Sequence, residues 1–386
     1  MERKIKVLLV DQIGHKGYFY DYGAAQNYSD RYDVTCYESD NTPRDVKTEG
    51  FNVVYGFHNV YTGNKIAKGI KYVKSLIELR RYIKDNEFDI VTLQWYDLPI
   101  VDKWFAQSIK RIKKSPRIVM TVHGIIPRED YPRYHDGLEK LYEEADALLI
   151  HSEQGLVHFN KCFNVNKPKY VISSAFRDEN DYRPINKCEA RKILGLPQDK
   201  TIVLSFGTIR EDKSIDLLLK AFPKAYEKNS NLYLLSGGTL NVKEKEYYRS
   251  LARECEKTGA AKIVFDYIDS NLEPAYYSAA DILVVPYSYI SQSGVAYCGL
   301  LYELPMIASD IPRLDLMAKD GVNADIFKSG DVTELTDRLV NLSTDHKRLK
   351  KYSEGSRQIR EADFSIKKRV AVTEKAYEDI LAGRIG

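Results

Sequence analysis

Short apolar runs alternate along the chain with longer stretches in which apolar residues recur every three or four positions. The runs are rich in Val, Ile and Leu and predict buried strands, whereas the longer stretches predict amphipathic helices. The strands expected in the first half are Lys6–Asp11, Asn52–Phe57, Asp89–Leu93, Arg117–Val122 and Ala147–His151, with helices such as Lys65–Lys84, Pro99–Lys114 and Gly137–Glu144 between them. Helices of this length between strands indicate parallel sheets with right-handed crossovers.

The alternation pauses in the polar stretch Phe176–Lys187 and then resumes to the end of the chain. The strands expected in the second half are Thr201–Phe206, Leu232–Ser236, Lys262–Phe265, Asp281–Pro286 and Met306–Ser309, with helices such as Ile215–Tyr226 and Val242–Glu256 between them. The pattern predicts two doubly wound α/β domains joined near residue 182. A final amphipathic helix is expected from Phe364 to Leu381.

Length and composition agree with this organisation. The chain has 386 residues, 44% of them hydrophobic, and its 58 basic and 55 acidic side chains leave a net charge of +3. These values exclude a disordered, collagen-like or small disulfide-bonded protein. The five cysteines are scattered and form no C-x-x-C pair, which favours a reducing compartment over a disulfide framework or a zinc site. The N-terminus has no signal-peptide pattern, so we expect a cytoplasmic protein.

One uncharged segment is long enough to span a bilayer. It runs from Ile282 to Tyr302 but contains Pro286, Gln292 and two glycines. We interpret it as a buried strand, a loop and a buried helix, with a transmembrane helix as the alternative.

Two expected helices in the first half are strongly basic. Lys65–Lys84 has one acidic residue, Glu78, and Lys103–Arg117 has none. Their apolar residues fall at helical spacing: Ile66, Ile70, Val73 and Ile77 in the first, and Trp104, Phe105, Ile109 and Ile112 in the second. Either these residues pack on the sheet and the lysines are only solvated, or the helices attach to an anionic membrane surface. Nucleic acid is not expected as a partner, because no recognised nucleic-acid-binding motif accompanies the charge.

Polar and glycine-rich turns follow several of the expected strands, where open α/β sheets bind ligands. In the first half, Gly14, His15, Gly17 and Gly23 occupy a loop expected to lead into a helix, and His123 ends another strand. His123 could instead be a structural histidine bonded to a neighbouring carbonyl. The glycine spacing is not G-x-G-x-x-G, so no dinucleotide fingerprint is present.

In the second half, polar turns also follow expected strands, and one of them contains two cations. Arg210 and Lys213 follow the strand Thr201–Phe206, and this pair suits a phosphate unless both are solvated surface charges. Another strand ends in Gly237 and Gly238, and a helix expected after Ser293 would point its free amides at an anion. No nucleophile motif is present. We expect no metal at the carboxylate pairs Asp178/Asp181 and Asp266/Asp269.

Several blocks of the chain, most of them in the second half, resemble the retaining, nucleotide-sugar-dependent glycosyltransferases of family 4, which have the GT-B fold. The matching blocks are Ala145–Ser152, Phe206–Lys213, Leu235–Gly238, Ala279–Pro286, Pro305–Ser309 and the final helix with Phe364 and Ser365. The resemblance implies two Rossmann-like domains facing each other across a cleft. Residues 1–180, completed by the helix at about 366–386, would bind the acceptor, and residues 181–365 would bind the nucleotide sugar.

The resemblance also implies roles for single residues. Arg210 and Lys213 would stabilise the leaving diphosphate, and His123 would contact the donor sugar. No cofactor, metal or protein nucleophile would be needed. The expected donor-binding residues are Gly207, Gly237, Gly238, Tyr267, Ile268, Ser293, Gly294, Val295 and Cys298, and the expected acceptor-side residues are Gly14, His15, Gly17 and Gly23.

The chain departs from the family at two glutamates eight positions apart, the second of which holds the donor ribose. The corresponding positions are near Ile290 and Cys298, and the sequence reads Ser-Gln-Ser-Gly over 291–294. The predicted function is transfer of a sugar, with UDP as the expected carrier, to a glycan or lipid-linked acceptor in surface polysaccharide synthesis. The alternatives are a GT-B-fold partner subunit without activity, and an epimerase or phosphorylase on the same fold.

Overall fold

The computed structural model describes residues 3–14, 18–44, 46, 48–123, 131–173, 183–290 and 293–384. The chain forms two compact units. The N-terminal unit comprises Met1–Asp178 and Phe364–Gly386, and the C-terminal unit comprises Glu179–Asp363. The predicted boundary at 180–181, the carboxylate pair Asp178/Asp181 and the loop residues His15 and Gly17 lie outside the described residues.

The N-terminal unit is built on a seven-stranded parallel sheet in the order β3-β2-β1-β4-β5-β6-β7. Its strands are β1 (Ile5–Asp11), β2 (Tyr32–Ser39), β3 (Asn52–Phe57), β4 (Ile90–Leu93), β5 (Arg117–Val122), β6 (Ala147–His151) and β7 (Lys169–Ile172). The expected strands of this half are present, and β2 and β7 are additional. Both additional strands contain tyrosines and charged residues, which interrupt the purely aliphatic pattern used to find the others.

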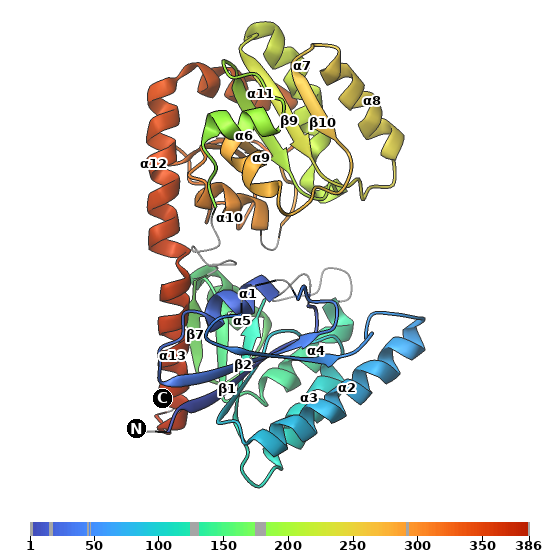
Figure 1. The fold of residues 1–386 in the computed structure, drawn as a ribbon, viewed down its shortest axis with the longest axis vertical. Coiled ribbons are helices and arrows are strands. Elements are labelled where there is room, and N and C mark those ends of the chain that lie inside the picture. Colours follow the sequence, from blue (N-terminus) through green and yellow to red (C-terminus); the bar gives the residue numbers. More distant parts are fainter. Residues whose placement is uncertain are drawn as a thin grey trace. The chain divides into compact units, whose positions relative to one another are not determined.

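Helices cover both faces of this sheet (Figure 1). The helices of this unit are α1 (Tyr18–Ala25), α2 (Lys65–Asn86), α3 (Pro99–Lys110), α4 (Tyr131–Tyr142), α5 (Glu153–Cys162) and α13 (Ile366–Leu381). One apolar core joins the sheet to α2, α3, α4 and α5, and another joins it to α1 and α13. The expectation that Gly23 lies in a loop is wrong: it lies inside α1, where burial of Tyr20, Tyr22 and Ala24 stabilises the helix.

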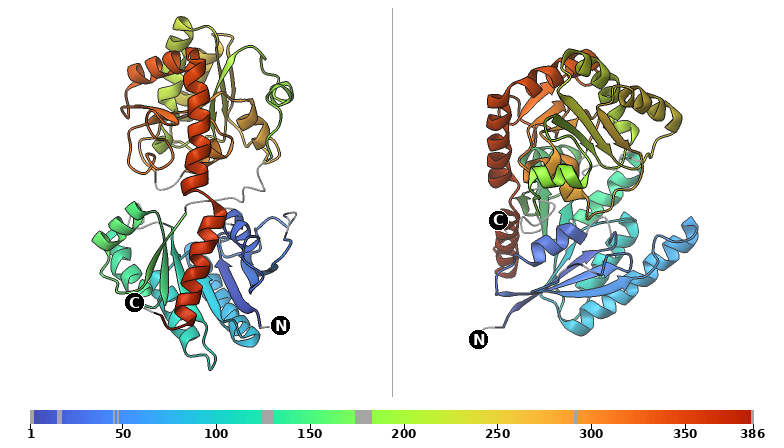
Figure 2. Two further views of the ribbon diagram at one scale, coloured as in Figure 1. Left: turned by 90° about the vertical axis from the view of Figure 1, so that its left-hand side faces the viewer. Right: turned by 45° about the horizontal axis from the view of Figure 1, so that its top comes forward.

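The last helix belongs to the N-terminal unit although it ends the chain. Helix α13 lies against β6, β7 and α1, as Figure 2 shows. Its Tyr377 is fully buried, and the hydroxyl lies 2.6 Å from Oγ1 of Thr92 and 3.1 Å from the hydroxyl of Tyr28. The first turn of α13 contributes Arg369, a buried side chain whose guanidinium lies 3.7 Å from the ring centre of Tyr20.

The C-terminal unit has a six-stranded parallel sheet in the order β10-β9-β8-β11-β12-β13. Its strands are β8 (Thr201–Phe206), β9 (Leu232–Gly237), β10 (Ala261–Val264), β11 (Ile282–Val285), β12 (Met306–Ser309) and β13 (Ala324–Phe327). Its helices are α6 (Lys187–Ile193), α7 (Ile215–Lys228), α8 (Lys245–Glu256), α9 (Glu273–Ala279), α10 (Gly294–Leu301), α11 (Val332–Thr344) and α12 (His346–Asp363), with the short 3-10 helix η2 (Glu211–Lys213). The uncharged segment from Ile282 is therefore a buried strand, a loop and a buried helix. Among the described residues, no helix is both long and apolar enough to cross a membrane.

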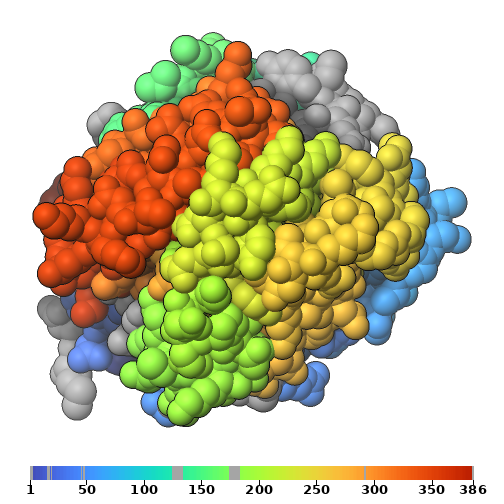
Figure 3. Space-filling view, turned by 90° about the horizontal axis from the view of Figure 1, so that it is seen from above, coloured from blue at the N-terminus to red at the C-terminus, as the bar shows by residue number. Residues whose placement is uncertain are grey.

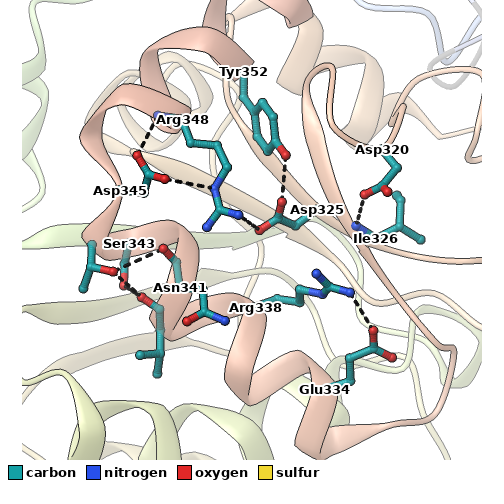
Figure 4. A network of polar contacts seen from close by, with 12 residues as sticks. Asp320, Asp325, Ile326, Glu334, Arg338, Asn341, Ser343, Asp345, Arg348 and Tyr352 are labelled. Atoms are coloured by element: carbon teal, nitrogen blue, oxygen red, sulfur yellow. Dashed lines mark hydrogen bonds and ion pairs between the residues drawn. The ribbon is translucent and has the colours of Figure 1, made fainter.

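A polar network fixes the C-terminal helices of this unit to the sheet (Figure 4). The hydroxyl of Tyr352 on α12 donates a 2.8 Å hydrogen bond to Asp325 on β13, and Arg348 lies 3.6 Å from the other oxygen of this buried carboxylate. Helix α11 packs against α7, and the two elements form neighbouring orange-red and yellow-green parts of the surface in Figure 3.

Candidate functional site

The strand order of each unit marks where a ligand can bind. Each order has the pattern 3-2-1-4-5-6, so the chain reverses its direction of winding between β1 and β4 and again between β8 and β11. Loops diverge at such a point and leave a crevice beyond the carboxyl ends of the strands. The candidate residues are found at these two edges.

In the C-terminal unit, the turn after β8 places a lysine ammonium at the strand reversal. Gly207 has φ +89°, a conformation that favours glycine. A Cβ atom on Gly207 would lie 3.4 Å from Nζ of Lys213 and 3.3 Å from a methyl group of Val295 at the start of α10. The Lys213 ammonium also lies 5.8 Å from the ring centre of buried Tyr287. These contacts place the cation beside the first turn of α10, where backbone amides are free for an anion.

The electrostatics of this turn favour a bound anion. Burial and the nearby Arg210 lower the pKa of Lys213 from 10.5 to about 8, although Asp212 acts in the opposite direction. Within the described part of the chain, the Lys213 ammonium has no hydrogen-bond or ion-pair partner. A phosphate oxygen would supply the missing counter-charge.

Arg210 is held in place by Asp212. Its Nε and Nη2 atoms each donate a 3.0 Å hydrogen bond to the Asp212 carboxylate. Asp212 in turn is tied to the loop after β11, because its carbonyl oxygen accepts a 3.0 Å hydrogen bond from the amide of Ser288. The bidentate pairing fixes the guanidinium plane, and the Nη1 donors face away from Asp212. Spacing in the sequence carries no signal for this positioning.

Two glycines on the neighbouring strand allow the loops to meet. A Cβ atom on Gly238 would lie 2.1 Å from the carbonyl oxygen of Gly207, and one on Gly237 would lie 3.2 Å from Ile268. The edge therefore brings Gly207, Gly237, Gly238, Ile268 and Lys213 together. Tyr267 is exposed, and within the described residues no side-chain hydrogen bond or ring contact joins it to this group.

Helix α10 begins at this edge with a capped end. The side chain of buried Ser293 accepts a 3.0 Å hydrogen bond from the amide of Ala296, so Ser293 is the N-cap and Gly294 and Val295 form the first turn. Cys298 follows one turn later, and its sulfur lies 3.7 Å from Oε1 of Glu273 at the start of α9. A carboxylate is therefore next to the position where the family carries its second glutamate. Sequence reasoning missed Glu273 because it comes from another helix at no diagnostic spacing. Ser291 and Gln292 lie outside the described residues.

In the N-terminal unit, His123 lies at the carboxyl edge of β5 and belongs to a hydrogen-bonded chain. The Nε2 atom of Gln94 donates a 2.7 Å hydrogen bond to buried Asp21, and Oε1 of Gln94 lies 3.2 Å from Nε2 of His123. This amide orientation requires Nε2 of His123 to carry the proton. Trp95 stacks on the imidazole with ring centres 4.0 Å apart.

Burial keeps this histidine neutral. Burial, followed by electrostatic interactions with His151 and Arg369, holds the pKa of His123 well below its ordinary value. Burial and Arg369 likewise lower the pKa of His151 to about 3. A neutral imidazole held in one tautomer can form directed hydrogen bonds to a sugar hydroxyl but supplies no positive charge.

Three carboxyl groups lie buried next to this chain, a cluster that the sequence did not reveal. Asp11 and Glu38 are paired in register on β1 and β2, and α1 adds Asp21, so that one oxygen of each lies within 4.8 Å of the others. Burial raises the pKa of Asp11 to about 7, and burial with mutual repulsion raises those of Asp21 and Glu38 well above the ordinary range. The three groups can share protons at neutral pH or ligate a divalent cation.

The remaining acceptor-side candidate, Gly14, has φ +64° and is packed tightly. A Cβ atom there would lie 2.0 Å from the side-chain oxygen of Asn41. Gly14 therefore closes the loop after β1 over the end of β2. His123, Gln94 and Asp11 are among the polar residues that the structure places at this edge.

Comparison with known proteins matches both halves of the chain to glycosyltransferases. The model for glycosyl transferases group 1 matches residues 186–359, and the model for glycosyl transferase 4-like domains matches residues 6–152. The chain is 25% identical over 206 residues to D-inositol 3-phosphate glycosyltransferase of Mycolicibacterium smegmatis, covering 53% of this chain and 46% of the relative. The chain thus spans about half the length of the curated relatives it matches.

Solved structures show the same fold over the whole chain. Sucrose-phosphate synthase from Thermosynechococcus elongatus has a TM-score of 0.75 at 16% identity, covering 98% of this chain and 100% of the other. Anabaena Alr3699/HepE in complex with UDP and glucose has a TM-score of 0.71 at 17% identity, with the same coverage. These structures are of the GT-B type, and the two sheets of this chain match them.

Proposed function

Because this chain belongs to the group 1 glycosyltransferases and has the GT-B fold, we propose that it transfers a sugar from a nucleoside diphosphate sugar to a glycan or lipid-linked acceptor. The observation that carries the proposal is the ammonium of Lys213 between Gly207 and the first turn of α10, which has no ion-pair partner among the described residues, with Arg210 fixed beside it. UDP is the proposed carrier, since a structural neighbour binds UDP and glucose. Synthesis of a surface polysaccharide is the proposed context.

The proposed transfer is retaining and needs no metal. The bond between the sugar C1 and the phosphate oxygen breaks, and the acceptor oxygen bonds to C1 on the same face. The acceptor proton passes to the leaving phosphate. Arg210, Lys213 and the first amides of α10 stabilise the negative charge that grows on the diphosphate. We propose that His123, neutral and held by Gln94, orients the donor sugar by hydrogen bonding.

Glu273 supplies the ribose contact in this proposal. Its carboxylate lies 3.7 Å from the sulfur of Cys298, so it occupies the neighbourhood of the glutamate that this chain lacks. A carboxylate accepts hydrogen bonds from two adjacent hydroxyls, whereas a thiol is a poor acceptor. The nearby carboxylate supports transferase activity over the alternative of an inactive GT-B-fold subunit, which rests on the missing glutamates.

Calorimetry with UDP, GDP, ADP and their sugars tests the proposal. We expect one nucleotide to bind at micromolar concentration and Arg210→Ala with Lys213→Ala to abolish that binding. Lys224→Ala, which removes an exposed lysine of α7, should leave it unchanged. Binding without transfer or donor hydrolysis would favour the inactive subunit. Absence of binding to any nucleotide would overturn the proposal.

A further inference from the structure

Helix α2 exposes three of the four apolar residues for which the sequence left packing on the sheet and attachment to a membrane as alternatives. Its buried side consists of Tyr72, Leu76, Leu79 and Ile83. Ile66, Ile70 and Ile77 lie on another side and are 76%, 65% and 39% exposed. Helical spacing produces both rows, so the pattern alone could not show which one meets the sheet.

Helix α3 exposes a second apolar row. Phe105 and Ile109 are buried, whereas Ile100 and Trp104, one turn apart, are 79% and 46% exposed. The helix also ends earlier than expected, at Lys110, so residues 111–116 form a turn and Arg117 begins β5.

The two rows adjoin. Helices α2 and α3 lie side by side on the same face of the sheet (Figure 1). Nε of Arg80 donates a 3.1 Å hydrogen bond to the carbonyl oxygen of Ser108. Ile77 lies one turn before Arg80, and Trp104 lies one turn before Ser108, so the two exposed residues are at corresponding levels of neighbouring helices. We call Ile66, Ile70, Ile77, Ile100 and Trp104 the outer patch.

Basic side chains surround the outer patch. Lys74 forms a 3.8 Å ion pair with Glu78. In the described part of the chain, the other basic residues without an acidic partner include Lys65, Arg81, Lys84, Lys103 and Arg111. Lys110 and Lys114 are different, because they pair with Glu144 and Glu87 at 3.1 Å and 2.8 Å. The carboxylate of buried Asp102 accepts hydrogen bonds from the hydroxyl of Tyr72 and the amide of Leu98.

We propose that the outer patch docks on an anionic lipid surface, with α2 and α3 lying in the plane of the interface. Exposed isoleucines and a tryptophan suit the boundary between headgroups and acyl chains, and the unpaired cations suit anionic headgroups. Basic side chains outnumber acidic ones around the patch, so it complements a uniformly anionic surface better than a second copy of the same patch. Repulsion between two such surfaces opposes self-association.

The outer patch lies toward the sheet edge to which the acceptor is assigned. Helices α2 and α3 begin where β3 and β4 end, so Ile66, Ile70 and Ile100 lie toward the same sheet edge as Asp11, Gln94 and His123. A lipid surface on the outer patch would border the edge to which we assign the acceptor. The docking surface itself does not depend on transferase activity.

The chain has only two tryptophans, which provides a direct readout. In Trp95→Phe, Trp104 is the sole indole. We expect its emission to shift to the blue, and to be quenched by lipids doxyl-labelled near the headgroup, with phosphatidylglycerol vesicles but not with phosphatidylcholine vesicles. An unchanged spectrum with both vesicle types would overturn the proposal.

In vesicle sedimentation, substitutions separate the contribution of the basic side chains to lipid binding from that of the apolar side chains. Neutralising Arg81, Lys84 and Arg111 to Gln should weaken partitioning about 100-fold at low salt. Ile70→Ser with Ile100→Ser should weaken it at least tenfold at any salt concentration. Ile193→Ser, which changes an exposed isoleucine of the C-terminal unit, is the matched control and should bind as wild type. Far-UV circular dichroism checks that each variant is folded. Wild-type binding by both groups of variants, or a dimer in gel filtration that Ile70→Ser dissociates, would refute lipid docking.

Discussion

The sulfur of Cys298 on α10 lies 3.7 Å from the carboxylate of Glu273 on α9. The two residues are 25 positions apart, and only the packing of α9 and α10 on the sheet brings them together. The carboxylate of Glu273 thus lies next to the position on α10 where this chain has Cys298 instead of a glutamate.

The first prediction concerns this carboxylate. Glu273→Gln should weaken UDP binding about tenfold or more, because a hydrogen bond to a charged group contributes roughly 1.5–3 kcal/mol. Calorimetry with UDP and 2′-deoxy-UDP measures the effect. The variant should bind the two ligands more equally than wild type does. Glu254→Gln, an exposed glutamate of α8, is the control, and an equal loss in both variants would contradict the ribose contact.

The second prediction concerns the charge on Lys213, whose pKa is lowered from 10.5 to about 8. Nucleotide affinity should fall as the pH rises through about 8, because the unliganded protein loses the ammonium that binds the diphosphate. The unfolding free energy should change in the opposite direction: the unfolded state binds more protons between pH 8 and 10.5, so this group's contribution rises with pH in that window. Each pH dependence is measured as the difference between wild type and Lys213→Met. The same difference taken between wild type and Lys224→Met should not change with pH.

The third prediction concerns the buried carboxyl cluster. The pKa of Asp11 is raised from 3.8 to about 7, so the folded state holds a proton that the unfolded state releases, and this contribution to stability is lost as the pH rises from 4 to 7. Asp11→Asn should therefore gain stability relative to wild type over that window, on the order of 2–4 kcal/mol by pH 7.

Urea denaturation at pH 4, 5.5 and 7 measures this difference, and the exposed Asp30→Asn should show no such trend. A cation bound by the cluster would give another result. Wild type would then be stabilised by added Mg²⁺ or Mn²⁺ at pH 7, and Asp11→Asn would not.

The fourth prediction concerns the attachment of α12 to the sheet. Tyr352→Phe removes the 2.8 Å hydrogen bond to buried Asp325 and should lower the unfolding free energy by about 1–3 kcal/mol. Tyr226→Phe is the matched control, because its hydroxyl has no hydrogen-bond partner within the described residues. Equal stability of both variants would show that Arg348 alone satisfies Asp325.

The sequence by itself determined the parallel α/β architecture, because buried strands and amphipathic helices leave different periods in the pattern. Ten strands were placed within about a residue or two, whereas β2, β7 and β13 were missed because charged and aromatic residues break their aliphatic runs. The cations Arg210 and Lys213 were found because their turn is continuous in sequence and follows a strand. The family was identified from blocks of the same kind.

Only the tertiary structure decided which of two helical rows on α2 is buried, since helical spacing fits both. It alone brought Glu273 to Cys298, and Asp11, Asp21 and Glu38 to one another, because those contacts join residues far apart in the chain. The pKa values of Lys213 and His123 likewise depend on burial, which is a property of packing. The helices and strands could therefore be predicted from the sequence, whereas the electrostatics of the two sheet edges could not.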